Sequence, residues 1–529
     1  MSPERLLRLL ADPACYPHAP TRVRIVQTHL SIVAIADDLV YKLKKPLRLP
    51  FVDFSSLALR RAACRQEVAL NRRLCDDVYL GTTALRSHGQ DVRFAALGDD
   101  CGPDDVEVAV VMKRLPQERM LDELLAHDAV APGQLVAVAE RLARFHATAD
   151  RSPNTRELGK PERLVAFAAA NFDELAELGA ADATDQPPDH GLPTQLLDAV
   201  RDAQAAAFAR LLPTLQRRAL AGRVCDGHGD LHARNICLTN PPTIYDCIEF
   251  NPALRCGDVV AEVAFLAMDL RYRGRRDLGD AFVTAYADAA RDPELPTLLA
   301  APIAYRAMVR AKVAALAARE PELPAADRAA AATSARAHLR LAAATLATAE
   351  GPWWIVVCGP PAAGKSRLAR ALAAIAGWPH LATDVVRKQL AGIVPTERAA
   401  AEHYSAEFSA HTYAELHRLA ERATRAGADA VLLDGNYAAP AQRAEAAAAA
   451  LAVGARLLVL HLHIDRNLAA SRAEHRRTDP TNVSDADPQV LAALHDRFVV
   501  PHDGEADRLI HLDGTCDTEA LVDRVLAFR

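Results

Sequence analysis

The sequence predicts a multidomain protein in which an α+β part precedes an α/β part with a parallel sheet. At 529 residues the chain is too long for one hydrophobic core and favours two to four domains. Short β-branched runs with one charged helix among them fill residues 22–115, and helical periodicity follows them. After Gly351-Pro352, apolar strands alternate with helices, which is the pattern of a parallel sheet.

Turn signals and changes of periodicity divide the chain into domains at 1–116, 117–350 and 351–529. The strands expected in the first part are RVRIVQ, SIVAIA, LVYKLKK and VEVAVVMKRL. Together with the helix SSLALRRAACRQEVALNRRL, they describe a small antiparallel sheet that carries one helix. The second part is expected to be mostly helical. Its alanine-rich end, residues 325–349, contains neither Gly nor Pro and is therefore predicted as a helix rather than a linker.

Composition and charge limit the classes of function. Half of the residues are apolar, a quarter are charged and the net charge is −6, which disfavours binding of nucleic acid or a membrane through an overall basic field. The start, MSPERLLRLLADP, has acidic residues and no continuous apolar run, so it predicts neither a signal peptide nor a membrane anchor. Ten scattered cysteines without metal-ligand spacing are typical of a reducing compartment. We expect a cytoplasmic protein.

The first constellation of chemical interest is His228-Gly229-Asp230-Leu231-His232-Ala233-Arg234-Asn235, followed after a short hairpin by Tyr245-Asp246. Phosphoryl transfer requires a carboxylate that orients the attacking hydroxyl and accepts its proton, and Asp230 suits that role. It also requires oxygen ligands for the Mg²⁺ that bridges the phosphates of ATP, which Asn235 and Asp246 can supply. Asp and Asn are common in loops, but the joint spacing between apolar strands favours a catalytic site.

This segment resembles the catalytic loop of the aminoglycoside phosphotransferase and choline-kinase-like family, a branch of the protein-kinase-like fold. The resemblance covers residues 22–345 and implies an N-lobe sheet and a helical C-lobe. It also implies a strand lysine that binds the α- and β-phosphates and pairs with a glutamate on the following helix. Lys42 and Lys44 lie on the same strand face, so either can be this lysine, and Lys42 has the better apolar approach. Glu67 is the expected partner. The turn before these strands lacks the glycines of protein kinases.

The helices after the catalytic loop carry many cations, among them Arg306 and Arg310 on one helix face. If this face is functional, it favours an anionic or phosphorylated hydroxyl compound over a polycationic aminoglycoside. The alternative is an ordinary solvated face. Features such as CIEFNPALRCGDVVAEVAFLAMDL are similar to bacterial proteins described as fused aminoglycoside phosphotransferase and ATP-binding proteins.

The second constellation matches G-x-x-x-x-G-K-S between an apolar strand and a helix. Its residues are Gly359, Pro360, Pro361, Ala362, Ala363, Gly364, Lys365 and Ser366. In that context the backbone N–H groups cradle phosphates at the helix N-terminus. Lys365 is expected to reach the β- and γ-phosphates and Ser366 to bind Mg²⁺. Asp434, which ends the strand AVLLD, is expected to be the second acidic metal residue, with a turn or helix-capping Asp as the alternative.

The C-terminal part resembles small P-loop kinases of the zeta-toxin, gluconate-kinase and polynucleotide 5′-kinase type, within the α/β P-loop NTPase fold. The resemblance implies that Asp384 takes the hydroxyl proton and that Arg387 holds the acceptor. It further implies a lid at residues 466–477, where Arg472 and Arg476 lie four apart on one helix face and stabilise the transferring phosphate. A surface helix is the competing interpretation for these arginines.

The sequence therefore predicts a bifunctional kinase with two ATP·Mg²⁺ sites, each phosphorylating a hydroxyl of a small molecule. One alternative is a nucleotide-sensing regulator with one catalytically silent domain. Another is a nucleic-acid-end or toxin-like kinase at the C-terminus, which the scarcity of aromatic residues for base stacking disfavours. The sequence leaves open both acceptors, any coupling between the sites, the oligomeric state and the choice between Lys42 and Lys44.

Overall fold

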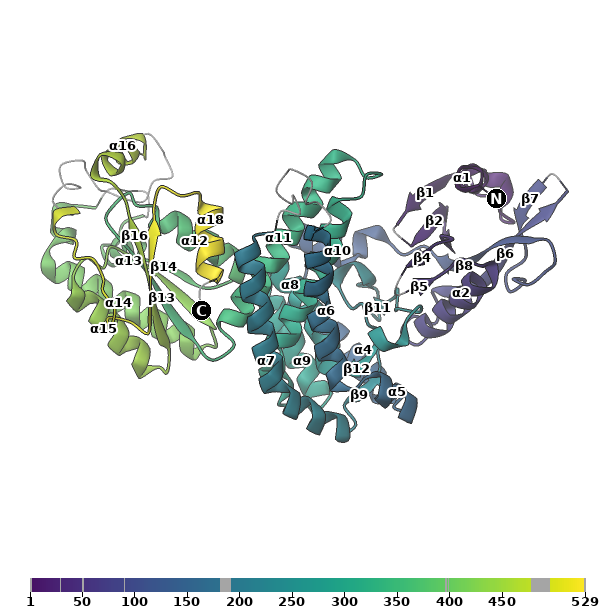
Figure 1. Cartoon of the computed structure of the whole chain (residues 1–529), viewed down its shortest axis with the longest axis horizontal. Helices are drawn as coiled ribbons and strands as arrows, with labels where there is room; N and C mark the ends of the chain where they lie inside the picture. Colours follow the sequence, from purple (N-terminus) through teal and green to yellow (C-terminus); the bar gives the residue numbers. More distant parts are fainter. Residues whose placement is uncertain are drawn as a thin grey trace. The chain divides into compact units, whose positions relative to one another are not determined.

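The computed structural model describes residues 2–28, 30–49, 52–89, 91–180, 192–394, 397, 399–476 and 495–527 (Figure 1). Contacts group the chain into two compact units, of which the first is Met1–Phe167 with Arg210–Arg306 and the second is Ala168–Ala209 with Ala307–Arg529. The division passes through three long helices, α6 (Pro161–Ala180), α7 (Thr194–Leu220) and α10 (Ala300–Ala318). The domain boundaries expected at residues 116 and 350 stay predictions.

The first unit begins with a six-stranded antiparallel sheet in the order β1-β2-β3-β8-β6-β7. Its strands are β1 (Val23–Gln27), β2 (Ser31–Ala36), β3 (Leu39–Lys44), β6 (Tyr79–His88), β7 (Asp91–Phe94) and β8 (Asp105–Lys113). Helix α2 (Leu57–Asn71), which the Ser56 side chain caps, packs on one face of this sheet. Because β3 pairs with β2 and β8 on its two sides, side chains that it directs toward α2 are largely shielded from water.

The opposite face of the sheet is covered by the N-terminal helix α1 (Pro3–Ala11) and a cluster of aromatic rings. Tyr41 of β3 contacts Tyr16 and Phe94 with ring centroids 4.9 and 4.6 Å apart. The short pair β4 (Arg48–Leu49) and β5 (Val52–Asp53) leads into α2. Both faces of the sheet are thus buried, and the position of β3 within it is fixed from both sides.

The rest of the first unit is mainly helical. Its further helices are α3 (Leu121–Ala126), α4 (Pro132–Thr148), α5 (Pro153–Leu158), α8 (Val259–Tyr272) and α9 (Arg276–Ala289). Two short antiparallel pairs interrupt them, β9 (Val224–Asp226) with β12 (Cys256–Asp258) and β10 (Ile236–Cys237) with β11 (Thr243–Ile244). Helix α8 is buried on nearly every side, which makes it a rigid base beneath the loops that join these strands. The predicted sheet-plus-helices architecture is confirmed.

The second unit contains a five-stranded sheet in the order β14-β15-β13-β16-β17, with every pair parallel. Its strands are β13 (Trp353–Cys358), β14 (His380–Ala382), β15 (Ala430–Asp434), β16 (Arg456–His463) and β17 (Arg508–Asp513). The helices after β13 are α12 (Lys365–Ala376), α13 (Thr383–Leu390), α14 (Ala406–Arg425), α15 (Pro440–Ala452), α16 (Arg466–Arg476) and α18 (Thr518–Ala527). Helices lie on both faces of the sheet, as the predicted alternation requires (Figure 1).

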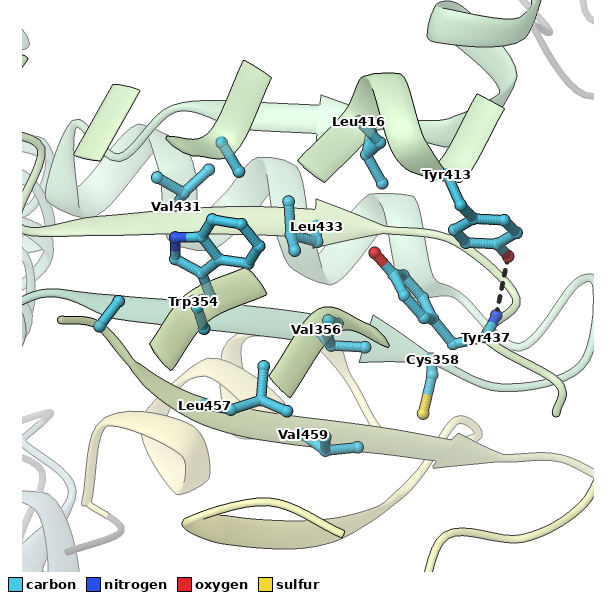
Figure 2. Packing of buried hydrophobic residues seen from close by; sticks show 14 of the residues in the cluster. Trp354, Val356, Cys358, Tyr413, Leu416, Val431, Leu433, Tyr437, Leu457 and Val459 are labelled. Carbon is cyan, nitrogen blue, oxygen red and sulfur yellow. Dashed lines mark hydrogen bonds between the residues drawn. The ribbon is translucent and has the colours of Figure 1, made fainter. Parts of the chain in front are cut away.

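Figure 2 shows the core between this sheet and helices α14 and α15. Every residue of β13 is buried, and Trp354, Val356 and Cys358 project from it into this core. At one end, the Tyr413 hydroxyl accepts a hydrogen bond from the Tyr437 backbone at 3.1 Å. A sheet buried on both faces explains why its strands are continuous apolar runs in the sequence.

Helix α11 (Ala325–Ala347) confirms that the alanine-rich segment is helical, and it packs on α12 and α18 of the second unit. Two ion pairs accompany this packing, Arg340 Nε to Asp523 Oδ1 at 2.6 Å and Arg336 Nη1 to Glu519 Oε2 at 3.0 Å. Among the described residues, none of the helices combines the length and apolar character needed to cross a membrane.

Candidate active sites

The candidate N-terminal site is centred on the ammonium group of Lys42. Its Nζ lies 2.9 Å from Glu67 Oε1 on α2 and 2.5 Å from Asp246 Oδ1, which follows β11. The side chain of Glu67 is fully buried, that of Lys42 is 14% exposed and that of Asp246 is 39% exposed. The fold therefore joins three predicted residues from distant parts of the chain, and Asp246 lies at the solvent side of the group.

Local electrostatics keep Lys42 and Glu67 charged. Burial raises the pKa of the Glu67 carboxyl, but the charges of Lys42 and Lys44 outweigh it, and the net shift is downward. Burial lowers the pKa of Lys42, but Asp246 and Glu67 raise it well above its usual range. A cation held between two carboxylates with one exposed side suits the binding of nucleotide phosphates.

Lys44, the alternative nucleotide lysine, lies deeper than Lys42. Its side chain is 2% exposed, and its Nζ lies 2.5 Å from Glu67 Oε2 and donates a short hydrogen bond to Glu249. Both lysines therefore reach Glu67, as their shared strand face predicts, but only Lys42 also touches Asp246. This geometry favours Lys42 as the lysine that meets phosphates.

The catalytic-loop residues are brought together by the pairing of β10 with β11. The Tyr245 backbone N–H donates to the Asn235 carbonyl at 3.0 Å. Asp246 directly follows Tyr245, so this hydrogen bond places it near Asn235. The Asn235 amide donates to the Asp230 carbonyl oxygen at 3.0 Å and to its carboxylate at 3.2 Å. Asn235 is buried, whereas the Asp230 side chain is about one-third exposed and open to an incoming acceptor.

Glu262 of α8 holds the start of this loop. Both of its carboxylate oxygens accept the His228 backbone N–H at 2.9 Å, and His146 Nε2 lies 3.6 Å from one of them. Burial raises the pKa of Glu262, but His146 and the contacts with His228 outweigh it and lower the pKa to about 2. Further along the loop, Asp269 of the same helix accepts the Ala233 N–H at 2.8 Å. Helix α8 thus fixes the loop through two carboxylates.

Asn71 is a supporting residue that the sequence analysis missed. Its side chain donates to the Glu67 carbonyl at 2.9 Å and accepts the Cys247 N–H at 2.9 Å, directly after Asp246. It therefore links the helix that carries Glu67 to the segment that carries Asp246, and Lys42 closes the ring. The sequence signal that could have revealed Asn71 is its place four positions after Glu67, on the same buried helix face.

Most of the cations expected to attract an anionic acceptor contact other groups of the protein. Arg306 is buried, donates to the Ala261 carbonyl at 3.0 Å and lies 4.6 Å above the Phe265 ring. The neighbouring basic residues form ion pairs, namely Arg271 and Arg276 with Asp280, Arg273 with Asp269, Arg275 with Asp128 and Asp277, and Lys312 with Glu174. Arg306 itself is buried, but the basic substrate face and its alternative, an ordinary solvated face, both stay predictions, because a helical spacing cannot show whether a cation has a partner.

The candidate C-terminal site is formed by the P-loop between β13 and α12. Gly364 caps α12 with φ 99°, and Gly359 has φ 144°. A methyl group on Gly359 would lie 2.3 Å from the Leu462 carbonyl oxygen, so only glycine fits there. Lys365 Nζ donates to the carbonyls of Gly359 and Pro360 at 3.0 and 2.9 Å, and Ser366 is exposed at the first turn. The loop thus has the shape of a phosphate cradle.

The carboxyl ends of three neighbouring parallel strands gather the remaining predicted residues. Asp434 ends β15 beside β13, is buried, and its Oδ2 lies 3.1 Å from His380 Nε2 of β14. Asp384 lies in the first turn of α13, directly after β14. Ligands of open α/β sheets bind at this edge, so Asp384 and Asp434 are on the side of the sheet that the P-loop occupies. His380 was not anticipated from the sequence.

Arg387 is buried and connects α13 to the segment before α14. Its Nη1 donates to the His403 carbonyl at 2.6 Å and to Ser409 Oγ at 3.2 Å, and its guanidinium lies 4.8 Å from the Tyr404 ring centroid. These contacts are all with groups of the protein itself, so the role of Arg387 in holding the acceptor stays a prediction.

Arg472, which the sequence predicts to lie in a lid, donates from Nη1 to the Gly514 carbonyl at 2.8 Å. Gly514 itself packs so closely on the P-loop that a methyl group there would lie 2.5 Å from the Ala363 carbonyl oxygen. Arg472 is thus anchored beside the phosphate cradle. The side chain of Arg476 and residue 477 of the expected lid lie outside the described residues.

The fold and the two sites define a class of protein. Residues 52–300 match the family model described as phosphotransferase enzyme family, and residues 355–501 match the model described as AAA domain. The first range contains Glu67, Asp230, Asn235 and Asp246 but begins after Lys42, and the second contains the P-loop with Asp384 and Asp434. The protein is a kinase, with a phosphotransferase domain followed by a P-loop kinase domain.

The chain belongs to the same family as an uncharacterized protein of Mycobacterium tuberculosis and one of Mycobacterium bovis. Each is 33% identical over 493 residues, covering 91% of this chain and 92% of the relative. Similar solved structures include a choline/ethanolamine kinase family protein from Mesorhizobium loti, with 14% identity, TM-score 0.38 and coverage of 65% of this chain and 98% of that one. Another is a gluconokinase from Sinorhizobium meliloti, with 21% identity, TM-score 0.24 and coverage of 33% and 90%.

Proposed function

We propose that the protein is a bifunctional ATP-dependent phosphotransferase, in which each domain transfers the γ-phosphate of ATP to a hydroxyl group of a small molecule. The observation that carries this proposal is the contact of Lys42 with both Glu67 and Asp246, which joins a strand, a helix and a loop some two hundred residues apart. Such a convergence of charged groups at a partly exposed site suits phosphate binding.

In the N-terminal domain, Lys42 binds the phosphates and Asp230 accepts the proton of the acceptor hydroxyl. As that oxygen forms its bond to the γ-phosphorus, the bond to the β-phosphate oxygen breaks and ADP leaves. Asn235 and Asp246 fit Mg²⁺, because the Asn235 amide nitrogen is engaged with Asp230 and leaves the amide oxygen as a ligand. Bound Mg²⁺ would neutralise phosphate charge.

No group of three or more His, Cys, Asp or Glu side chains within the described residues could hold a metal ion alone. An ion at either site would therefore be shared with the phosphates of the nucleotide, which is usual for Mg²⁺ in kinases. In the C-terminal domain, Lys365 and the P-loop amides bind the phosphates, Ser366 and Asp434 fit Mg²⁺, and Asp384 accepts the hydroxyl proton. Arg387 and Arg472 hold the acceptor and the transferring phosphate.

The test is a calorimetric titration of the full chain with Mg·ATP, for which we expect two binding sites. Lys365→Ala should remove one and Lys42→Met the other, because each deletes the lysine of one phosphate site. Lys160→Met, which changes an exposed lysine in an ion pair with Glu157, is the matched control and should keep both.

If Lys365→Ala abolished all binding, the N-terminal domain would not be an independent nucleotide site. If both sites bound ATP but only one domain transferred phosphate to any compound of a hydroxyl library, the protein would be a kinase regulated by a silent nucleotide-binding domain.

A further inference from the structure

Behind the Lys42 site lies a second ion pair that the proposed reaction does not use. The side chains of Lys44 and Glu249 are 2% and 6% exposed, and they are hydrogen bonded to each other. Lys44 also lies 5.6 Å from the centroid of the Phe54 ring, so an aromatic side chain covers part of this ion pair. Burying an ion pair costs free energy, because both charges lose their contact with water.

This pair is coupled to the nucleotide lysine through Glu67. One carboxylate oxygen of Glu67 faces Lys42 at 2.9 Å and the other faces Lys44 at 2.5 Å. Together with Asp246 and Glu249, the cluster holds two cations and three carboxylates, which gives one net negative charge. Because the two lysines share one carboxylate, each lysine weakens the electrostatic attraction between Glu67 and the other lysine.

We propose that Lys44 and Glu249 are positioning residues that set the availability of Lys42 for the nucleotide. This inference depends on the proposed function of Lys42. Without Lys44, both oxygens of Glu67 and the carboxylate of Glu249 compete for Lys42, which is then drawn inward from the phosphates. Without Glu249, Lys44 pairs with Glu67 alone, and the attraction between Glu67 and Lys42 becomes weaker. Removing both charges at once restores the balance.

The geometry is consistent with the titration of these groups. Burial lowers the pKa of Lys44, but Glu67 and Glu249 outweigh it, and the pKa is raised. Burial raises the pKa of Glu249, and the lysine charges only partly offset this rise. Lys44 is therefore the firmly charged partner, and the charges of both Lys44 and Lys42 favour the ionised form of Glu249.

The experiment measures Mg·ATP affinity by calorimetry in full-length Lys365→Ala protein, where only the N-terminal site remains. Lys44→Met should weaken ATP binding by about tenfold or more, since a buried carboxylate loses its partner. The double variant Lys44→Met with Glu249→Gln should recover affinity to within about threefold of the parent, because the two charges are removed together.

The matched control is a buried ion pair that joins α2 to the same sheet, Arg60 Nε to Glu107 Oε1 at 2.8 Å, with side chains 8% and 6% exposed. Arg60→Met should lower the melting temperature but leave the ATP dissociation constant unchanged. If Lys44→Met only lowered the melting temperature in the same way, or if the double variant bound no better than the single one, the positioning role would be refuted. If the Lys365→Ala parent bound no ATP at all, the proposed N-terminal function would fail instead.

Discussion

The two candidate sites are built from different parts of the polypeptide. In the N-terminal site, the charged groups come from a strand, a helix and a loop, and they contact one another directly, as Lys42 does with Glu67 and Asp246. In the C-terminal site, the cradle is formed by backbone between Gly359 and Gly364, and its lysine rests on loop carbonyls. One site depends on long-range side-chain contacts and the other on local backbone shape.

This difference predicts different sensitivities to mutation. A site made of coupled side chains should fail when one charge is removed, whereas a site made of backbone should fail when a glycine acquires a side chain. The cradle at a helix N-terminus uses backbone N–H groups, which every residue of this loop except Pro360 and Pro361 provides, so its side-chain requirements concentrate on the glycines and one lysine. The three predictions below test this contrast.

The largest effect is expected for Asp230→Asn, which keeps the shape of the side chain but removes the proton acceptor. Phosphate transfer by the N-terminal domain should fall by roughly 10²–10⁴-fold while ATP affinity barely changes. The measurement is transfer of labelled γ-phosphate to an acceptor found by screening hydroxyl compounds, in the Lys365→Ala background. Undiminished transfer would contradict the role of Asp230.

A smaller effect is expected for Gly359→Ala in the P-loop. The φ of 144° is unfavourable for alanine, and the new methyl group would clash with the Leu462 carbonyl at 2.3 Å. We expect ATP affinity at the C-terminal site to fall by roughly 10–100-fold, which corresponds to strain of a few kcal/mol. Calorimetry in the Lys42→Met background isolates this site.

Gly454→Ala is the matched control for backbone strain. Gly454 also has positive φ, 72°, but nothing lies within 4 Å of the added methyl group, and it is far along the chain from the P-loop. This variant should lose stability and keep its ATP affinity. Equal loss of affinity in both variants would show that the effect reports general destabilisation and not the shape of the cradle.

The smallest effect concerns Glu262, which supports the catalytic loop without meeting substrate. Its folded pKa, about 2, lies below the usual value of 4.5, so its stabilisation is fully present above pH 4.5 and is lost as the pH falls toward 2. Glu262→Gln should therefore lower the free energy of unfolding by about 2 kcal/mol at pH 7. The gap in unfolding free energy between the unchanged protein and this variant should narrow below pH 4.5.

Thermal melting between pH 7 and pH 3 measures this gap, with Glu140→Gln as the control because the Glu140 side chain is 52% exposed. A gap that is independent of pH would show that the carboxylate charge of Glu262 does not hold the loop.

Contiguous features of both sites could be predicted from the sequence, and features that arise from distant contacts could not. The P-loop is eight consecutive residues whose backbone shape is local, and the segment from Asp230 to Asn235 is similarly compact. The strand period of two predicts that Lys42 and Lys44 share a face, but it cannot distinguish them. The choice is made by Asp246, which lies 204 residues further along the chain.

The same reasoning explains why the sequence does not reveal the contacts of Asn71, Glu249 and Arg306. Asn71 and Glu249 gain their roles only through contacts with Cys247 and Lys44, and no local pattern signals such contacts. Burial of Arg306 against Phe265 and the Ala261 carbonyl is likewise a tertiary effect, which the helical spacing of Arg306 and Arg310 does not reveal. Architecture was more readily predicted, since apolar periodicity directly reflects which faces are buried.

Helix α11 has a practical consequence for anyone who wishes to prepare the P-loop domain alone. The obvious cloning boundary is Gly351, where the sequence changes character, but a fragment starting there would leave Asp523 and Glu519 without Arg340 and Arg336. It would also uncover the faces of α12 and α18 on which α11 packs, which invites aggregation. A gene fragment that begins near Ala325 retains this helix and should yield the more soluble product.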